Sequence, residues 1–153
     1  MEIRKLFKKT WIKLEDYKSL NDSQYPGCYI LAYSDKNLEK KQIKIGDIFY
    51  VGMSNSLGGV KQRLSQFISG IERGYGHSAG NRFLKEINKN IPYSKYKTDK
   101  RFFVISLCLP CLVNKKDRTY KDLIKMGEVA KFEYEVLAYI KEKIGKEPEL
   151  NKK

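Results

Sequence analysis

Two strand-like segments that carry tyrosine lie close together in the first third of the sequence. In the first, YPGCYILAY, residues Tyr29, Leu31 and Tyr33 alternate with other apolar residues, as in a strand with two distinct faces. The second reads IGDIFYVGMSN, and the charged stretch SDKNLEKKQIK between them is typical of a hairpin loop. This arrangement predicts two antiparallel strands, over about Gly27 to Ser34 and about Ile45 to Gly52.

Three helices are predicted from the rest of the sequence. Apolar residues recur at helical spacing over about Gly59 to Arg73, and a glycine-rich loop then leads into a second helix over about Asn81 to Lys89. The longest helix is predicted over about Tyr120 to Ile144. Gly145 supplies its C-terminal stop, because glycine readily adopts the left-handed conformation.

A third strand is predicted over about Arg101 to Leu109, where the run RFFVISLCL is apolar and β-branched and Pro110 ends it. The expected fold is therefore α+β, with a three-stranded, mostly antiparallel sheet flanked by helices. At 153 residues the chain is long enough for one core and too short for two ordinary domains. We expect one domain over 1–153, with an N-terminal extension over about 1–25.

The net charge is strongly positive, since 31 Lys and Arg residues against 18 Asp and Glu residues give +13. Such a surface attracts polyanions, of which nucleic acids are the commonest in cells. A lysine-rich proteome with basic surfaces everywhere is the alternative explanation. No apolar run reaches the ~20 residues of a membrane-spanning helix, and the start MEIRKLFKKTWIK lacks the apolar stretch of a secretory signal. We therefore expect a cytoplasmic protein with a nucleic-acid partner.

Three cysteines, an odd number, indicate reduced thiols in a cytosol-like compartment. Cys108 and Cys111 form a C-x-x-C pair, but only Cys28 and His77 are left to complete the four ligands of a zinc site. The pair also ends a strand-like run, whereas redox motifs sit at a helix N-terminus. We interpret these cysteines as small buried apolar side chains.

Glu133 stands out on the last helix because it falls inside an apolar stripe, whereas Glu135 projects from the opposite side. The stripe is formed by Val129, Phe132, Val136, Leu137, Ile140 and Ile144. A carboxylate on a packed face is costly unless a cation or hydrogen-bond donors satisfy it, so a metal ion is a natural partner. A helix edge or a salt bridge to a lysine is the alternative.

Three other side chains are candidates for chemistry. Arg63 borders the apolar face of its helix, from which a guanidinium can reach a phosphate, although a surface arginine is the simpler interpretation. Tyr29 and Tyr50 lie on adjacent predicted strands, so their hydroxyls can converge. Nearby positive charge is expected to lower their pKa. Tyrosines are also simply common in strands.

Taken in order, these pieces resemble the GIY-YIG endonuclease family. The resemblance rests on Gly27-Cys28-Tyr29, Tyr50-Val51-Gly52, Arg63, Glu133 and an Asn151 that follows GKEPEL, and it covers about Gly27 to Asn151. It implies a metal-dependent endonuclease that hydrolyses DNA phosphodiester bonds with one Mg²⁺ or Mn²⁺.

The resemblance also implies a role for each residue. Tyr29 is the general base or positions the attacking water, and Tyr50 is its hydrogen-bonding partner. Arg63 stabilises the transition state, Glu133 holds the metal, and Asn151 helps to hold the active site.

The sequence departs from the family pattern at three places. Cys28 replaces the central residue of the first motif, Phe67 stands where members often carry a histidine, and Ala32 stands where others place a lysine. Lys61 and His77 are the candidates to supply the missing proton relay. A non-catalytic nucleic-acid-binding module on the same scaffold is the alternative function.

Overall fold

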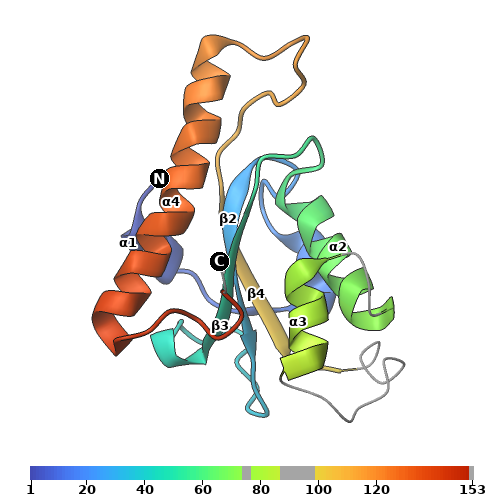
Figure 1. The fold of residues 1–153 in the computed structure, drawn as a ribbon, viewed down its shortest axis with the longest axis vertical. Coiled ribbons are helices and arrows are strands. Elements are labelled where there is room, and N and C mark those ends of the chain that lie inside the picture. The colour runs from blue at the N-terminus through green and yellow to red at the C-terminus, as the bar shows by residue number, and fades with distance from the viewer. Residues whose placement is uncertain (74–76, 87–98, 152–153) are drawn as a thin grey trace.

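A four-stranded antiparallel sheet lies at the centre of the computed structural model, which describes residues 1–73, 77–86 and 99–151 (Figure 1). The strand order is β1-β4-β2-β3, so β3 lies at one edge. The bounds are β1 Ile12–Lys13, β2 Gly27–Tyr33, β3 Ile48–Ser54 and β4 Phe102–Cys108.

The predicted α+β class is confirmed, but the sheet has four strands rather than three. The additional strand, β1, lies in the predicted N-terminal extension and pairs Ile12 with Val104. Two residues are too few for an alternating pattern to be visible in a sequence. The predicted antiparallel hairpin is present, with Tyr29 opposite Gly52 and Leu31 opposite Tyr50.

In the described residues, four α-helices flank the sheet: α1 Ile3–Phe7, α2 Gly59–Arg73, α3 Ser78–Glu86 and α4 Tyr120–Ile144. Two short 3₁₀ turns, η1 Leu14–Ser19 and η2 Ile45–Asp47, precede β2 and β3, so β3 begins later than predicted. None of the helices in the described ranges is long and apolar enough to cross a membrane.

The bounds of α2 and α4 agree with the prediction. Thr119 caps the start of α4 in a capping box with Asp122, and Gly145 ends it with φ 75°. By contrast, α3 begins at Ser78 rather than at Asn81, and the predicted end at 87–89 lies outside the described residues.

The sheet separates two apolar cores (Figure 1). On one face, Tyr29 and Leu31 of β2 pack with α2 and α3. On the other face, Cys28, Ile30 and Ala32 pack with α1 and α4. The predicted alternation of β2 is therefore confirmed, and the two motif tyrosines belong to the α2/α3 side.

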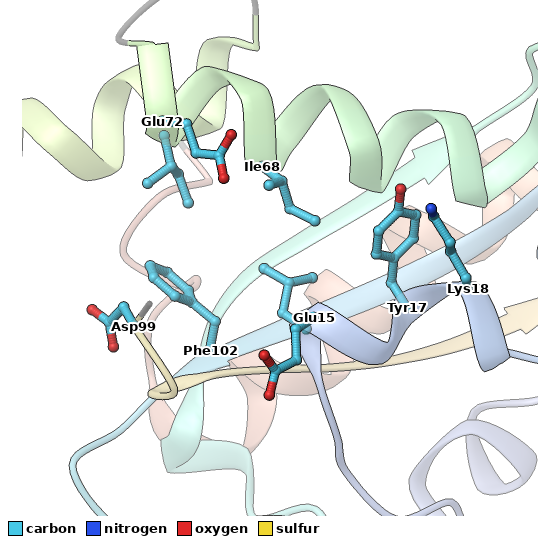
Figure 2. Close-up of a pocket in the computed structure, with 9 residues that line it drawn as sticks. Glu15, Tyr17, Lys18, Ile68, Glu72, Asp99 and Phe102 are labelled. Atoms are coloured by element: carbon cyan, nitrogen blue, oxygen red, sulfur yellow. The ribbon is translucent and has the colours of Figure 1, made fainter. Parts of the chain in front are cut away.

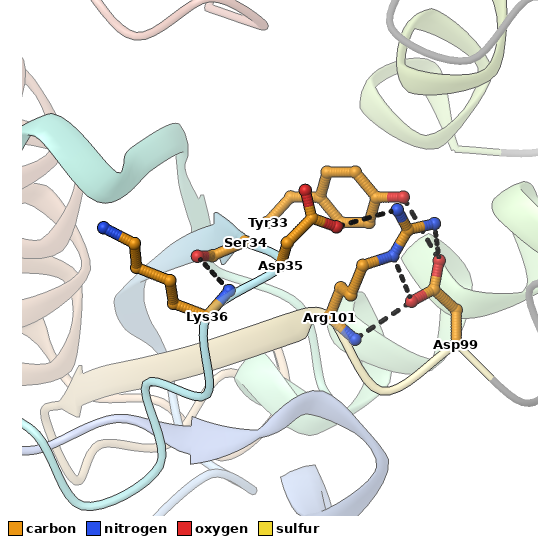
Figure 3. A network of polar contacts seen from close by, with 6 residues as sticks. All are labelled: Tyr33, Ser34, Asp35, Lys36, Asp99 and Arg101. Atoms are coloured by element: carbon orange, nitrogen blue, oxygen red, sulfur yellow. Dashed lines mark hydrogen bonds and ion pairs between the residues drawn. The ribbon is translucent and has the colours of Figure 1, made fainter.

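One polar network ties the ends of β2 and β4 together (Figure 3). The Arg101 guanidinium forms an ion pair of 2.9 Å with Asp99 and one of 3.2 Å with Asp35, and its Cζ lies 4.6 Å from the centre of the Tyr33 ring. The Tyr33 hydroxyl donates to Asp99 Oδ2 at 3.2 Å. The charge of Arg101 is thus matched by carboxylates of the protein itself.

All three cysteines are free thiols. Cys28 and Cys111 are buried, and Cys108 Sγ lies 3.8 Å from Ser106 Oγ at the end of β4. Burial raises the pKa of Cys108 to about 11, which keeps this thiol protonated at neutral pH.

Candidate functional site

A pocket of about 280 Å³ lies where the edge strand β3 meets helices from both faces of the sheet. Four of the predicted site residues line it, namely Tyr50, Arg63, Glu133 and Asn151. The rest of its lining is Met53 of β3 and two residues of α3, Ser78 and Arg82. The fold thus gathers into one pocket side chains that are widely separated in the sequence.

Asn151 completes the edge of the sheet beside this pocket. Val51 N–H donates to Asn151 Oδ1 at 2.8 Å, and Asn151 Nδ2 donates to the Val51 carbonyl at 2.7 Å. One residue earlier, the N–H of the fully buried Leu150 donates to the Phe49 carbonyl at 3.0 Å. The Asn151 amide thus satisfies backbone groups that an edge strand would otherwise leave unpaired. It holds β3 in place at Val51, the residue that follows Tyr50.

Tyr50 is the motif tyrosine that lines the pocket, and Tyr29 lies behind it with ring centroids 6.1 Å apart. Tyr29 is fully buried, and within the described residues its Oη meets no hydrogen-bond partner of regular geometry. Burial raises the pKa of Tyr29 well above its usual value, and Tyr50 raises it further, while Arg63 lowers it. The positive charge of Arg63 thus acts in the expected direction, but desolvation is the larger effect and the net change in pKa is upward.

Gly52 explains how the two tyrosines fit on the strand pair. A Cβ at this position would lie 2.7 Å from Tyr29 Oη and 2.8 Å from Tyr50 Cε1, closer than packed atoms approach. Since Tyr29 lies directly opposite Gly52 in the sheet, the missing side chain is the space that the Tyr29 phenol occupies. Gly52 of the second motif is thus needed to leave space for Tyr29 of the first motif.

Replacing Gly52 with alanine should therefore displace both phenols. We expect unfolding free energy to fall by about 1–3 kcal/mol, as for overpacked cores, and any cleavage activity to fall with it. Gly127→Ala in α4 is the matched control, since no atom lies within 4 Å of a Cβ there and alanine favours a helix by about 0.5–1 kcal/mol. Denaturant unfolding of the two variants measures the difference, and equal stability of Gly52→Ala and the unmodified protein would contradict the steric account.

Glu133 lies on the buried face of α4, with 7% of its surface exposed, and enters the pocket from the side opposite to Arg63. Glu135 lies on the outer side and pairs with Lys131 at 3.2 Å. The predicted difference between the two glutamates is thus confirmed. The apolar stripe is shorter than predicted, because Ile144 at the helix end is 40% exposed.

Arg63 reaches the pocket from α2, and its Nη1 donates to Gln66 Oε1 at 3.1 Å. Arg82 of α3 was not predicted as a site residue, although it lines the same pocket. Nothing in the sequence distinguishes Arg82 among 31 basic residues. Only the packing of α3 against α2 shows that it faces inward.

The two relay candidates have different surroundings. His77 is buried, and its Nδ1 accepts from the N–H groups of Ala79 and Gly80 at 3.2 and 3.4 Å, which explains the early start of α3. Its ring meets Tyr50 edge-on, at 6.3 Å between centroids. Burial, followed by Arg63, lowers the pKa of His77 to about 4, so the ring is neutral at pH 7. Lys61 is exposed on α2 and does not line the pocket.

The donor set of the pocket is compatible with one magnesium-like ion. No cluster of three or more His, Cys, Asp or Glu side chains suited to a metal occurs in the part of the chain that the structure describes. The pocket instead offers the single buried carboxylate of Glu133. Mg²⁺ is commonly held by one or two carboxylates while retaining waters and taking up substrate phosphate oxygens. Glu133 therefore fits such an ion when a phosphate is present.

A second pocket, of about 290 Å³, lies between η1, α2 and the start of β4 (Figure 2). It has an apolar floor and a rim that includes Glu15 and Asp99. Both of these carboxylates form ion pairs within the protein, Glu15 with Lys100 and Asp99 with Arg101. None of the described residues that line it was predicted as a site residue.

Comparisons with protein-family models, with curated proteins and with solved structures found no match. The likeness to GIY-YIG endonucleases therefore rests on the sequence motifs alone.

Proposed function

We propose that this chain is a metal-dependent endonuclease of the GIY-YIG type that hydrolyses DNA phosphodiester bonds. The observation that carries the proposal is the pocket itself, in which Tyr50, Arg63, Glu133 and Asn151 meet although the sequence motifs were predicted separately. The net charge of +13 supports a polyanionic substrate. A carboxylate and arginines around one cavity suit phosphoryl transfer, where catalysis depends on positioning and charge.

In the proposed reaction, a water oxygen forms a new bond to phosphorus while the bond to the leaving oxygen breaks. The water loses one proton and the leaving oxygen gains one, so that a phosphomonoester and a hydroxyl result. Arg63 binds the non-bridging oxygens, whose charge increases during attack. Tyr50 orients the water from the pocket wall, with Tyr29 behind it. Glu133 would hold the divalent ion, which when bound supplies positive charge at the leaving oxygen.

The tyrosines predict an alkaline pH dependence. Burial, followed by Glu133, raises the pKa of Tyr50, while Arg63 and Arg82 oppose the rise. A phenol with a raised pKa is almost fully protonated at neutral pH. If its phenolate accepts the water proton, cleavage should increase about tenfold per pH unit between about pH 7 and pH 9. Single-turnover rates across this range would measure the slope, and Tyr50→Phe should flatten it. A rate that does not rise between about pH 7 and pH 9 would reject a tyrosine base.

Incubation of supercoiled plasmid with Mg²⁺ or Mn²⁺, beside a chelator control, tests the proposed function. Conversion to nicked or linear DNA that requires the metal supports an endonuclease. The alternative, a non-catalytic nucleic-acid-binding module, predicts binding without cleavage. Tyr50, Arg63, Glu133 and Asn151 line one pocket and Tyr29 lies behind it, which favours the enzyme, because a binding module has no need of that set.

A further inference from the structure

The pocket contains a second guanidinium that the motifs do not include. Arg82 lines it from α3, together with Arg63 from α2. The Arg82 Nε atom is buried and has no hydrogen-bond partner among the described residues. A buried N–H donor without an acceptor is costly, so its retention in a pocket indicates that an acceptor binds there.

Arg101 provides a comparison, because it is an arginine with a structural role in this protein. Its guanidinium is matched by Asp99 and Asp35 and packs over Tyr33 (Figure 3). In the described part of the chain, neither Arg63 nor Arg82 forms an ion pair with a carboxylate, and Arg63 donates only to the neutral Gln66. The two guanidiniums repel each other, and the described lining of the pocket sets only the Glu133 carboxylate against them. Two positive charges for one negative charge favour the binding of a further anion.

The electrostatic effects on neighbouring groups agree with this placement of the two charges. Arg63 and Arg82 both lower the pKa of His77, and both lower the pKa of Tyr50 against the effect of burial. Glu133 has the opposite and larger charge effect on the pKa of Tyr50. Both guanidiniums and the carboxylate therefore act on the tyrosine that we place beside the attacking water.

We propose that Arg82 is a second phosphate-binding residue of the pocket and that it forms, with Arg63, a two-guanidinium cradle for the phosphoryl group that is cleaved. This inference rests on the proposed function of the same site. A phosphodiester carries one negative charge in the ground state and gains a second when water attacks, so two guanidiniums match the transition state better than the substrate. Ser78, at the start of α3, adds a hydroxyl donor to the same wall.

Cleavage kinetics of Arg82→Gln test the cradle directly. We expect the single-turnover rate constant to fall about 10²-fold or more, the typical cost of a transition-state donor, while the Kd for uncleaved DNA changes only a few-fold. Arg82→Lys keeps the charge but not the two-donor geometry and should recover only part of the rate. Arg4→Gln, an exposed arginine on α1 outside the pocket, is the matched control and should leave the rate unchanged. A change in Kd with an unaltered rate constant would overturn the cradle.

Thermal stability separates this role from a structural one. Arg82 forms no ion pair in the described part of the chain and shares the single pocket carboxylate, Glu133, with Arg63, so the melting temperature of Arg82→Gln should stay close to that of the wild type. A structural arginine would give a lower melting temperature, as Arg101→Gln should. A loss of activity accompanied by a fall in the Arg82→Gln melting temperature comparable to that of Arg101→Gln would assign Arg82 to folding and reject the proposal.

Binding of inorganic phosphate provides a readout that does not depend on cleavage. At constant ionic strength, phosphate should raise the melting temperature of the wild type and of Arg4→Gln, because a ligand of the native state stabilises it. The shift should be lost in both Arg63→Gln and Arg82→Gln. Phosphate stabilisation without any plasmid cleavage would reject the nuclease and keep the cradle. A shift that is absent from the wild type, or that persists in Arg82→Gln, would overturn the cradle.

Discussion

Replacing Glu133 with glutamine is expected to reduce metal-dependent DNA cleavage by a factor on the order of 10³ while leaving the fold intact. Glutamine retains the shape and hydrogen-bonding capacity of the side chain and removes only the charge that would hold the ion. Glu133 is buried on the packed side of α4. Glutamine has nearly the same size as glutamate, so the change adds no bulk there. Plasmid cleavage measures the activity, and circular dichroism with thermal unfolding measures the fold.

Glu135→Gln is the matched control, since Glu135 lies on the same helix but on its outer side, paired with Lys131. It should change stability by less than about 0.5 kcal/mol and leave cleavage unaffected. Glu133→Leu should be as inactive as Glu133→Gln and more stable, because it extends the apolar stripe. Full activity of Glu133→Gln, in a preparation free of contaminating nuclease, would reject the metal site.

The second large effect expected is on DNA binding. Affinity of the Glu133→Gln variant for duplex DNA should fall by about 10³-fold or more between about 50 mM and 200 mM salt, as for proteins that neutralise six or more phosphates. The physical reason is the release of counterions from DNA by a chain of net charge +13. Fluorescence anisotropy over this salt range gives the slope.

A duplex with methylphosphonate linkages is the control for this measurement, because it lacks the phosphate charges and should bind weakly with little salt dependence. Sequence should matter much less than salt, since phosphate contacts carry no base information. An affinity for ordinary duplex that barely responds to salt would show that the positive charge is not what binds DNA.

The helices that sequence reasoning placed well are those with strong local signals. The apolar repeat of α2 and the stop at Gly145 after α4 are properties of neighbouring residues, so they can be read without the fold. The start of α3 depends instead on the His77 side chain turning back to cap the helix. The two-residue strand β1 exists only because β4 offers it a partner.

The residues of the candidate site likewise separate into those that the sequence predicts and those that only the fold reveals. The motif order identified Tyr50, Arg63, Glu133 and Asn151, whose convergence the pocket then shows. Which of the two motif tyrosines faces the pocket could not be predicted, because both project from the same side of the sheet and the packing of α2 decides which is covered. Arg82 could not be predicted as a site residue for a related reason, since its surroundings in the fold, and not its neighbours in the sequence, distinguish it from other arginines.

The wall of the pocket depends on the pairing of Asn151 with Val51, a contact that closes a long loop of the chain. Residues 100 positions apart are joined there through one side-chain amide, and loop-closure entropy opposes contacts of such long range. If the segment that carries Leu150 and Asn151 separates from β3, the strand regains an unpaired edge, the pocket loses part of its wall, and Leu150 leaves the core that packs against α2 and α3. Under the proposed function, local opening at this seam would abolish cleavage at a smaller cost in free energy than global unfolding.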